Sequence, residues 1–289
     1  MTSHDVVRQV RRICKTRKVG HAGTLDPLAT GVLPVAIGDG TKVLQFLLTD
    51  NKSYRAVFQL GVTTDTLDSE GRIVQEQAVA ADIEGDIIPA CQQFRGDILQ
   101  IPPMYSALKR NGVPLYKLAR QGEIVEREAR PVTISRLDVV SIDLPYVVID
   151  VDCSKGTYIR TLIADIGEEL GCGAHMTDLR RTRSGQFGIA DCVTLEELKN
   201  SSEESLGVLS LDEALADYPA VQVADSAVVA LRCGVPPAKD QTFADVEIEI
   251  GQLVRLQIDG SLVAMSRFAP NRNNEKRGDF ELLRVFVGK

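Results

Sequence analysis

The sequence lacks the features that would place it in a membrane or outside the cell. No stretch of its 289 residues approaches the ~18 consecutive apolar residues that a membrane-spanning helix needs. The N-terminus has no apolar segment of the kind found in a secretory signal peptide. Hydrophobic residues make up 44% of the chain and charged residues 25%, which is typical of soluble globular proteins. We therefore expect a cytoplasmic protein with no membrane contact.

Cysteine and histidine are too scattered for the common metal, redox and triad motifs. The six cysteines include no C-x-x-C pair, so neither a zinc ribbon nor a disulfide framework fits. Cys172 and His175 form a lone C-x-x-H, which carries little weight as a metal site without a second ligand pair. The three histidines have no nucleophile-elbow context. The segment Gly38-Asp-Gly-Thr-Lys42 suggests a phosphate loop. Because no G-x-x-x-x-G-K-[ST] pattern occurs, we exclude a nucleoside triphosphate site.

Glycine and proline are instead concentrated in one stretch, Lys18-Val-Gly-His-Ala-Gly-Thr-Leu-Asp-Pro-Leu-Ala-Thr-Gly-Val-Leu-Pro34. Three glycines allow tight or left-handed backbone, namely Gly20, Gly23 and Gly31. Pro27 fixes its own φ and biases Asp26 toward an extended conformation. A carboxylate held in this way could act as a nucleophile or base. Asp-Pro is also a common turn pair, so local composition leaves both interpretations open.

The net charge of −7 hides an uneven distribution. Between Val7 and Gly20 the chain has six basic residues and no acid: Arg8, Arg11, Arg12, Lys15, Arg17 and Lys18. Further basic pairs are Lys109-Arg110 and Arg180-Arg181, whereas acids gather after Val193. A local cationic surface binds polyanions whatever the total charge, although a solvated surface explains any single run equally well.

Apolar periodicity predicts the main elements. A helix starts at Thr2-Ser3-His4-Asp5, with Val7 and Val10 on its apolar face and basic residues opposite. The sequence predicts these further segments: strands at Val32–Ile37, Tyr54–Leu60, Tyr146–Cys153, Val246–Ile250, Leu253–Ile258 and Leu282–Val287, helices at Thr41–Leu48, about Ala80–Phe94 and Tyr158–Leu170, and a loop at Thr63–Gly71. The short C-terminal strands predict a small β-barrel, preceded by a domain boundary within 193–218.

Two further regions bear on chemistry. The stretch 101–130 interleaves Tyr105 and Tyr116 with basic residues, which suits a flexible arm against RNA or a variable surface insertion. Lys155, Tyr158 and Arg160 lie at a strand-to-helix junction, where catalytic side chains are often displayed. Arg160 is the best candidate for a guanidinium beside Asp26, where it would lower the pKa of that carboxyl.

Four separated motifs now point to one family. Gly20-His-Ala-Gly-Thr-Leu-Asp-Pro-Leu-Ala-Thr-Gly31 closely resembles the catalytic motif of the TruB-type tRNA pseudouridine-55 synthases. Pro102-Pro-Met-Tyr-Ser-Ala-Leu-Lys109, Cys153-Ser-Lys-Gly-Thr-Tyr-Ile-Arg160 and Leu179-Arg-Arg-Thr are similar to further motifs of that family, in the expected order. The resemblance implies an α+β pseudouridine synthase fold with a largely antiparallel mixed sheet and a small C-terminal PUA-like β-barrel. It implies a catalytic domain at 1–210, with an RNA-binding insertion at about 101–130, and a PUA-like RNA-binding domain at 211–289.

The resemblance also implies residue roles. Asp26 matches the catalytic nucleophile, Arg160 its arginine partner, and Tyr54 the tyrosine that stacks on a flipped-out uracil and assists proton removal. Tyr158 and Leu179 match residues that line the uracil pocket, and His21 matches the histidine that contacts the everted RNA. Asp68 and Lys155 are further candidates for substrate contact. Base flipping accounts for these residue types, because aromatic and apolar side chains take up the extruded base.

The implied reaction is the isomerisation of uridine 55 in the tRNA T-loop to pseudouridine, without metal or cofactor. The expected partner is the T-arm stem-loop of tRNA, bound by a monomer. Two alternatives stay open, a tRNA-binding or tRNA-folding module with secondary catalysis and a synthase acting on other RNAs. Members of the family usually carry a short Lys-Pro strand before the Thr-Ser that stands here at positions 2 and 3, and we expect its loss to weaken edge pairing of the sheet.

Overall fold

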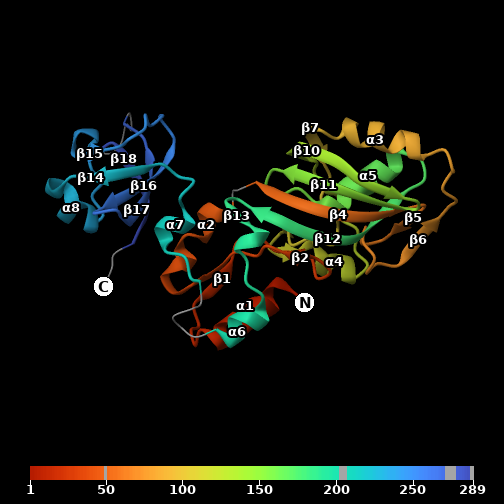
Figure 1. Ribbon diagram of the computed structural model, residues 1–289, viewed down its shortest axis with the longest axis horizontal. Helices are drawn as coiled ribbons and strands as arrows, with labels where there is room; N and C mark the ends of the chain where they lie inside the picture. The colour runs from red at the N-terminus through yellow and green to blue at the C-terminus, as the bar shows by residue number, and fades with distance from the viewer. Residues whose placement is uncertain (49–50, 202–206, 271–277, 287–289) are drawn as a thin grey trace. The chain divides into compact units, whose positions relative to one another are not determined.

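The protein has an α+β fold, seen in a computed structural model that describes residues 1–48, 51–201, 207–270 and 278–286 (Figure 1). The chain divides into two compact units. The first contains Met1–Val6, Gly23–Pro34 and Leu48–Val193, and the second contains Val7–Ala22, Val35–Leu47 and Thr194–Lys289. α1 (Ser3–Ile13) has residues in both. Each unit is described separately below.

A mixed, largely antiparallel sheet of seven strands is the framework of the first unit (Figure 1). Six strands are antiparallel neighbours in the order β13 (Phe187–Gly188), β12 (Ala174–Ser184), β4 (Lys52–Leu60), β11 (Tyr146–Cys153), β10 (Arg130–Asp143) and β7 (Gly96–Gln100). β2 (Thr30–Gly31) pairs in parallel with β12. The strands predicted at 54–60 and 146–153 are therefore confirmed as β4 and β11, and the mixed sheet is confirmed as well.

Two helices cover one face of this sheet, α3 (Glu84–Gln93) and α5 (Ile159–Glu169). Leu162, Ile163 and Ile166 of α5 are fully buried in one core with Phe58 of β4. Gly171 follows α5 with a φ of +72°, a conformation that ends helices and favours glycine. Both predicted helices are confirmed, although α3 is shorter than the predicted 80–94.

The opposite face of the sheet carries ion pairs among the described residues. Alternation along β4 places Arg55 there, and its guanidinium donates two hydrogen bonds of 2.8 Å to Asp150 of β11. Arg136 of β10 bridges Asp138 at 2.6 Å and Asp150 at 3.5 Å. A period of two residues, apolar inward and charged outward, thus fixes which face is covered.

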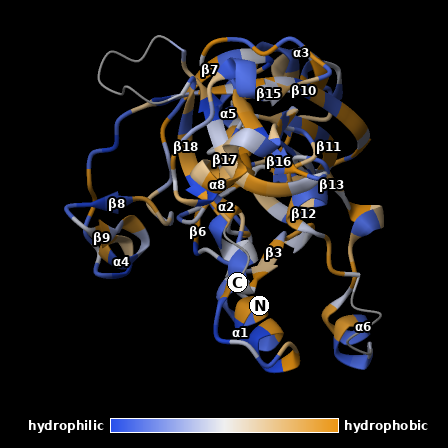
Figure 2. Cartoon of the chain, turned by 90° about the vertical axis from the view of Figure 1, so that its left-hand side faces the viewer, coloured by the Kyte–Doolittle hydropathy of each residue, from blue (hydrophilic) through white to orange (hydrophobic). Residues whose placement is uncertain are grey.

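The predicted arm leaves the sheet after β7 (Figure 2). It contains a short hairpin of basic β8 (Lys109–Arg110) and apolar β9 (Val113–Pro114), followed by α4 (Leu115–Arg120). The Arg127 guanidinium donates to the carbonyl of Pro102 at 3.0 Å and joins the two ends of the arm. A second hairpin, β5 (Val62–Thr64) and β6 (Ile73–Glu76), encloses most of the segment predicted as a polar loop.

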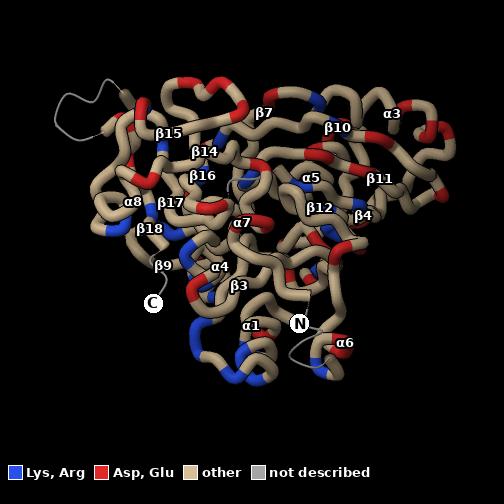
Figure 3. Tube along the Cα trace, turned by 60° about the vertical axis from the view of Figure 1, so that its left-hand side comes forward, with Lys and Arg blue, Asp and Glu red and all other residues tan. Residues whose placement is uncertain are grey.

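The N-terminal part of the second unit pairs β1 (Val19–His21) with β3 (Val35–Ile37). The 3₁₀ helix η1 (Gly38–Lys42) and α2 (Leu44–Leu47) follow, so the predicted strand at 32–37 and helix at 41–48 are only partly confirmed. Helix α1 is confirmed, with Val7 and Val10 buried and Arg8, Arg11 and Arg12 exposed. Lys and Arg gather on α1 and on the loop that follows it (Figure 3).

The first unit ends with the 3₁₀ helix η2 (Ile189–Asp191). The described residues of the acidic region after 193 form two short helices, α6 (Leu195–Asn200) and α7 (Leu211–Ala214). Asp212 of α7 accepts hydrogen bonds from Arg255, Gln257 and the Leu262 amide at 2.8, 2.6 and 2.7 Å. These bonds fix α7 to the C-terminal sheet.

That C-terminal sheet has five strands in the order β15 (Thr242–Phe243), β14 (Ala220–Val223), β16 (Leu253–Ile258), β17 (Ser261–Phe268) and β18 (Phe280–Val285), accompanied by α8 (Asp225–Arg232) and η4 (Lys239–Gln241). β16 confirms the predicted strand at 253–258, and β18 overlaps the one predicted at 282–287, whose last residue lies outside the described part. The strand predicted at Val246–Ile250 is wrong, because those residues form no strand and both ends are exposed. No closed barrel is found among the described residues, where β15 and β18 are the edges of the sheet.

No helix within the described ranges is both long enough and apolar enough to cross a membrane.

Candidate active site

Asp26 lies on a loop, Gly23–Pro34, that is attached to the sheet at both ends. Leu28 and Ala29, which follow the Asp-Pro pair, pack against the core of the first unit. The loop leaves at Gly31, whose φ of +97° and contact with the Arg181 backbone leave no room for a Cβ. Gly23 also has a positive φ, of +93°. The expected left-handed backbone is therefore confirmed at these two glycines. Gly20 in β1 is not left-handed, but a Cβ there would come within 2.6 Å of a Leu44 side-chain carbon.

The Asp26 carboxylate and the Arg160 guanidinium form a two-point ion pair, as the sequence predicts. Nε of Arg160 donates to Oδ2 at 2.9 Å, and Nη2 donates to Oδ1 at 3.0 Å. Arg160 is 4% exposed and Asp26 32% exposed, so the carboxylate is the part of the pair that solvent or a ligand can reach. Planar bidentate pairing of this kind fixes orientation as well as charge.

Burial raises the pKa of Asp26 above its ordinary value, while the charge and hydrogen bonds of Arg160 act in the opposite direction. The nearby Asp68 carboxylate also raises the pKa. The sequence-based expectation of a lowered pKa is thus half right. The guanidinium has the predicted sign, but desolvation is the larger effect.

Arg160 has further partners that the sequence does not reveal. Its Nη1 donates to the carbonyl of Thr66 at 2.9 Å and lies 3.3 Å from Oδ2 of Asp68, which is buried. Its Nη2 also donates to the carbonyl of Tyr105 at 3.0 Å. Backbone acceptors of this kind depend on the tertiary path of the chain, and no residue type signals them.

Tyr54 and Tyr158 lie near this ion pair, and Leu179 shares a face of the sheet with Tyr54. Tyr54 and Leu179 are on the helix-covered face of β4 and β12, since Leu179 is paired with Ala56 two residues beyond Tyr54. Burial raises the pKa of Tyr54 to about 12, and the Asp26 charge acts on both tyrosines. The predicted residues Asp26, Tyr54, Asp68, Tyr158 and Arg160 are therefore gathered in one place, and Leu179 packs in the same core as Tyr54.

Tyr158 is held by a residue that the sequence did not indicate. Gln100, only 2% exposed, accepts from the Tyr158 amide at 2.7 Å and donates to its carbonyl at 3.1 Å. Tyr158 directly precedes α5 with an extended backbone. This pair of hydrogen bonds fixes the turn from β11 into the helix that carries Arg160.

His21 and Lys155 are the two remaining predicted residues. His21 belongs to the second unit, where it pairs with Val35 across β1 and β3. Lys155 is exposed in the turn between β11 and α5.

Arg181 corrects another expectation. The sequence assigned it to a cationic surface with Arg180, but its side chain is only 1% exposed. It is two residues from Leu179 in β12 and so shares the buried face of the sheet. This alternation was the signal that could have placed it.

The lone C-x-x-H is not part of a metal-ligand cluster within the described residues. Nδ1 of His175 is 3.0 Å from the carbonyl of Val62, and the Cys172 thiol donates to the carbonyl of Gly173.

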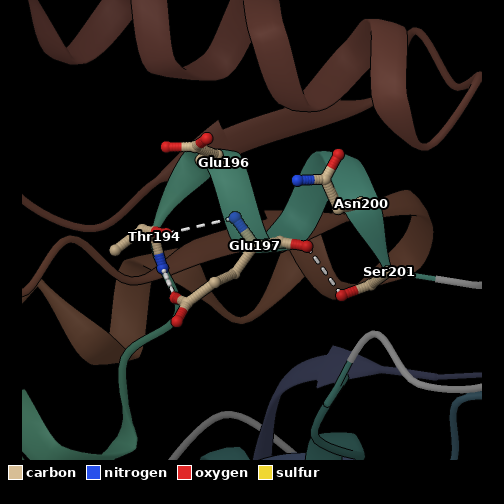
Figure 4. Close-up of a pocket in the computed structure, with 5 residues that line it drawn as sticks. All are labelled: Thr194, Glu196, Glu197, Asn200 and Ser201. Atoms are coloured by element: carbon tan, nitrogen blue, oxygen red, sulfur yellow. Dashed lines mark hydrogen bonds between the residues drawn. The ribbon is translucent and has the colours of Figure 1, made fainter.

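A separate hollow beside α6 contains none of the predicted site residues (Figure 4). Two of its polar side chains cap the start of α6, because the Thr194 hydroxyl accepts from the Glu197 amide and the Glu197 carboxylate accepts from the Thr194 amide. The Ser201 hydroxyl donates to the Glu197 carbonyl at the other end of the helix.

Comparison with known proteins gives a consistent result. Residues 11–159 match the model of the TruB family pseudouridylate synthase (N terminal domain), and residues 160–218 match the tRNA pseudouridylate synthase B C-terminal domain. The chain is 50% identical over 288 residues to the tRNA pseudouridine synthase B of Syntrophotalea carbinolica, covering 99% of this chain and 94% of that protein. It is 43% identical to the protein of the same name from Pseudomonas aeruginosa, covering 94% and 91% of the two chains.

A solved structure is similar over the same extent. A chain of the "Crystal Structure of a Cbf5-Nop10-Gar1 Complex" is 32% identical with a TM-score of 0.78, covering 99% of this chain and 82% of that one. The family models together match more than half of the sequence, and the four motifs with the Asp26–Arg160 pair lie inside them. The chain belongs to the TruB family of pseudouridylate synthases.

Proposed function

We propose that this protein is a tRNA pseudouridine synthase that converts uridine 55 of the T-arm to pseudouridine, with Asp26 as the nucleophile. Family membership supports the reaction class, and the names of the close relatives support tRNA as the substrate. The observation that carries the proposal is the Asp26–Arg160 pair, a partly exposed carboxylate held at two points by a buried guanidinium.

The arrangement suits a nucleophile that must be ionised yet poorly solvated. Burial removes part of the water that would otherwise shield the Asp26 carboxylate, and the charge and hydrogen bonds of Arg160 favour its charged form. Because the loop and α5 hold both partners, the carboxylate needs little reorganisation when a uridine arrives.

The groups around the pair suit a flipped-out base. Leu179 offers an apolar surface, and Tyr54 and Tyr158 offer aromatic rings, which together offset part of the few kcal/mol that unstacking costs. In the reaction the C1′–N1 bond breaks, a C1′–C5 bond forms, H5 leaves as a proton and N1 gains one. A pKa of about 12 keeps the Tyr54 hydroxyl protonated at neutral pH, so we assign Tyr54 to stacking first and to assistance of proton removal second.

We assign RNA contacts beyond the base to the basic and exposed parts of the chain. These are α1, the arm at 101–130, Lys155 and His21. We retain 1–210 as the catalytic domain and 211–289 as a PUA-like RNA-binding domain. We further propose that the protein acts as a monomer and that it acts in the cytoplasm, where tRNA is modified.

Tritium release tests the proposal directly. A T-arm stem-loop with 5-tritiated uridine at position 55 should lose its label with the wild-type protein, because C5 exchanges its hydrogen for the bond to C1′. Asp26→Asn should release none while it still binds the stem-loop. Asp82→Asn, which makes the same chemical change at an exposed position before α3, should retain full activity.

Three contrary outcomes would overturn the proposed function or the proposed role of Asp26. Binding without any release by the wild-type protein would indicate a tRNA-binding or tRNA-folding module. Release from an unrelated RNA hairpin at the same rate would indicate a synthase for other RNAs. Undiminished release by Asp26→Asn would remove Asp26 from the mechanism.

A further inference from the structure

Arg181 is the largest side chain among those fully buried in the described residues. Within the described chain it forms no ion pair with a carboxylate, unlike Arg160. A buried guanidinium is costly unless hydrogen bonds replace its lost hydration. The groups that replace it are therefore informative, and they belong to the loop of Asp26 and to Tyr54.

The side chain connects the two ends of the Asp26 loop. Nε donates to the carbonyl of Val32 at 2.7 Å, and Nη2 donates to the carbonyl of Gly23 at 3.2 Å. These carbonyls lie three residues before and six residues after Asp26. One planar guanidinium therefore fixes the distance between the two ends of the loop.

The backbone of Arg181 holds the same loop a second time. Its carbonyl accepts from the Val32 amide at 2.8 Å, and it pairs with Gly31 where β2 joins β12. A Cβ at Gly31 would overlap this carbonyl, which shows how closely the loop approaches β12. The loop and β12 are thus joined by both main chain and side chain at a single residue.

Tyr54 is the third contact. It lies opposite Arg181 in the antiparallel register of β4 and β12, on the same face of the sheet. The guanidinium interacts with the Tyr54 hydroxyl and lowers its pKa, against the larger raising effect of burial. Arg160 and Asp68 are the charges that shift the pKa of Asp26. Arg181 therefore acts on the pKa of Tyr54, and Arg160 acts on that of Asp26.

We infer that Arg181 is a positioning residue, which holds the ends of the Asp26 loop and the Tyr54 hydroxyl in their reactive arrangement. The inference rests on the proposed synthase activity, but its structural part can be measured independently. Lysine at position 181 would keep the charge, yet its single nitrogen cannot donate in the fixed fork that spans Val32 and Gly23. Methionine would remove both charge and fork.

The test compares Arg181→Lys and Arg181→Met with Arg55→Lys, a control on the outer face of β4. Single-turnover tritium release from the T-arm stem-loop should slow about a hundredfold in Arg181→Lys, since a displacement of about 1 Å has that effect. The KM of Arg181→Lys in steady-state turnover should stay within about threefold of wild type. Arg181→Met should be slower still. Its rate should also rise less with pH than the rate of Arg181→Lys, because Tyr54 has lost the neighbouring cation. Arg55→Lys should match wild type.

Hydrogen exchange supplies a readout that does not require activity. Amides in the peptide 23–34 should exchange faster in Arg181→Lys than in wild type or Arg55→Lys, because the loop has lost its side-chain attachment. Should Arg181→Met fail to fold, Arg181→Lys decides the question alone. Wild-type turnover with unchanged exchange in Arg181→Lys would overturn the inference, as would a raised KM with unchanged turnover, which would make Arg181 an RNA-binding residue. An inactive wild-type protein would overturn the proposed function instead, and the exchange measurement would still decide the loop attachment.

Discussion

Arg160 contacts Asp26 through two hydrogen bonds, of 2.9 and 3.0 Å, and the same guanidinium lies 3.3 Å from the Asp68 carboxylate. One buried cation thus serves two carboxylates. Asp26 is the more exposed of the two, and Asp68 is occupied by the Thr66 hydroxyl at 2.6 Å and the Glu70 amide at 3.1 Å. Asp68 therefore helps to orient Arg160, and Asp26 is the carboxylate that remains accessible to a substrate.

Replacing Arg160 with lysine should impair both orientation and ionisation of Asp26. A lysine nitrogen cannot bond both carboxylate oxygens in a plane, so turnover should fall by about a hundredfold or more. Arg160 lowers the pKa of Asp26, so its weaker replacement should move the acid limb of the pH–rate profile to higher pH. Single-turnover tritium release across acid and neutral pH measures both effects.

Arg136→Lys is the matched control for that experiment, because Arg136 pairs with carboxylates on the outer face of the sheet. It should leave rate and acid limb unchanged. An Arg160→Lys protein with an unmoved acid limb would contradict the assigned electrostatic role of Arg160.

The ionised Asp26 carboxylate should make the folded protein less stable at neutral pH than at acid pH. Its folded pKa is raised above the unfolded value, mainly by burial, so between the two values the native state holds the proton more tightly. Its contribution to stability is therefore lost as pH rises through the folded pKa. Because asparagine does not titrate there, the free energy of unfolding of Asp26→Asn relative to wild type should increase from acid to neutral pH. The increase amounts to about 1.4 kcal/mol for each unit between the two pKa values.

Asp150→Asn provides a comparison of opposite sign. The hydrogen bond from Arg55 lowers the pKa of Asp150, so its stabilisation is present above the unfolded pKa and lost as pH falls. Urea unfolding across the same pH range should show the difference from wild type decreasing for Asp150→Asn while it increases for Asp26→Asn. Parallel trends for the two variants would contradict the burial effect at Asp26.

Much of the site could be predicted because its residues carry local signals. Asp26 has the Asp-Pro restraint, and Arg160 follows a strand with strong apolar character, which places it at the start of α5. The contacts of Arg160 with the Thr66 and Tyr105 carbonyls could not be predicted, because any residue type supplies a carbonyl. Arg181 was misplaced because a run of charges was interpreted as surface, although alternation with Leu179 puts it inside.

The C-terminal part shows a different limit. Val246-Glu-Ile-Glu-Ile250 alternates as well as a strand does, yet it forms none. Alternation shows that a segment would have one apolar and one polar face. It does not show whether a neighbouring strand offers unpaired backbone N–H and C=O groups for it to pair with. The predicted barrel depended on this strand, whereas β16, with the same pattern, is buried between β14 and β17.

Gly31→Ala should destabilise the protein more than the loss of glycine flexibility alone. The φ of +97° is unfavourable for alanine, and the added Cβ would overlap the Arg181 carbonyl. We expect a loss of at least about 2 kcal/mol in the free energy of unfolding, together with loss of activity. Gly171→Ala is the control, since its φ is +72° with open space around it, and it should cost only about 1 kcal/mol. Equal losses in thermal or urea unfolding would mean that the close approach of the loop to β12 carries no energetic weight.

The exposed basic side of α1 should contribute to RNA affinity through phosphates. Arg12 is exposed on the helix where Lys and Arg gather (Figure 3). If it neutralises one phosphate, Arg12→Gln should weaken binding of the T-arm stem-loop and reduce the slope of log Kd against log salt by about 0.7 to 0.9. Arg95→Gln, which removes a partner of Asp138 on the outer face, should leave that slope unchanged. An unchanged slope in Arg12→Gln would favour the alternative that this side of α1 is merely solvated, because a phosphate contact cannot be lost without releasing fewer counterions.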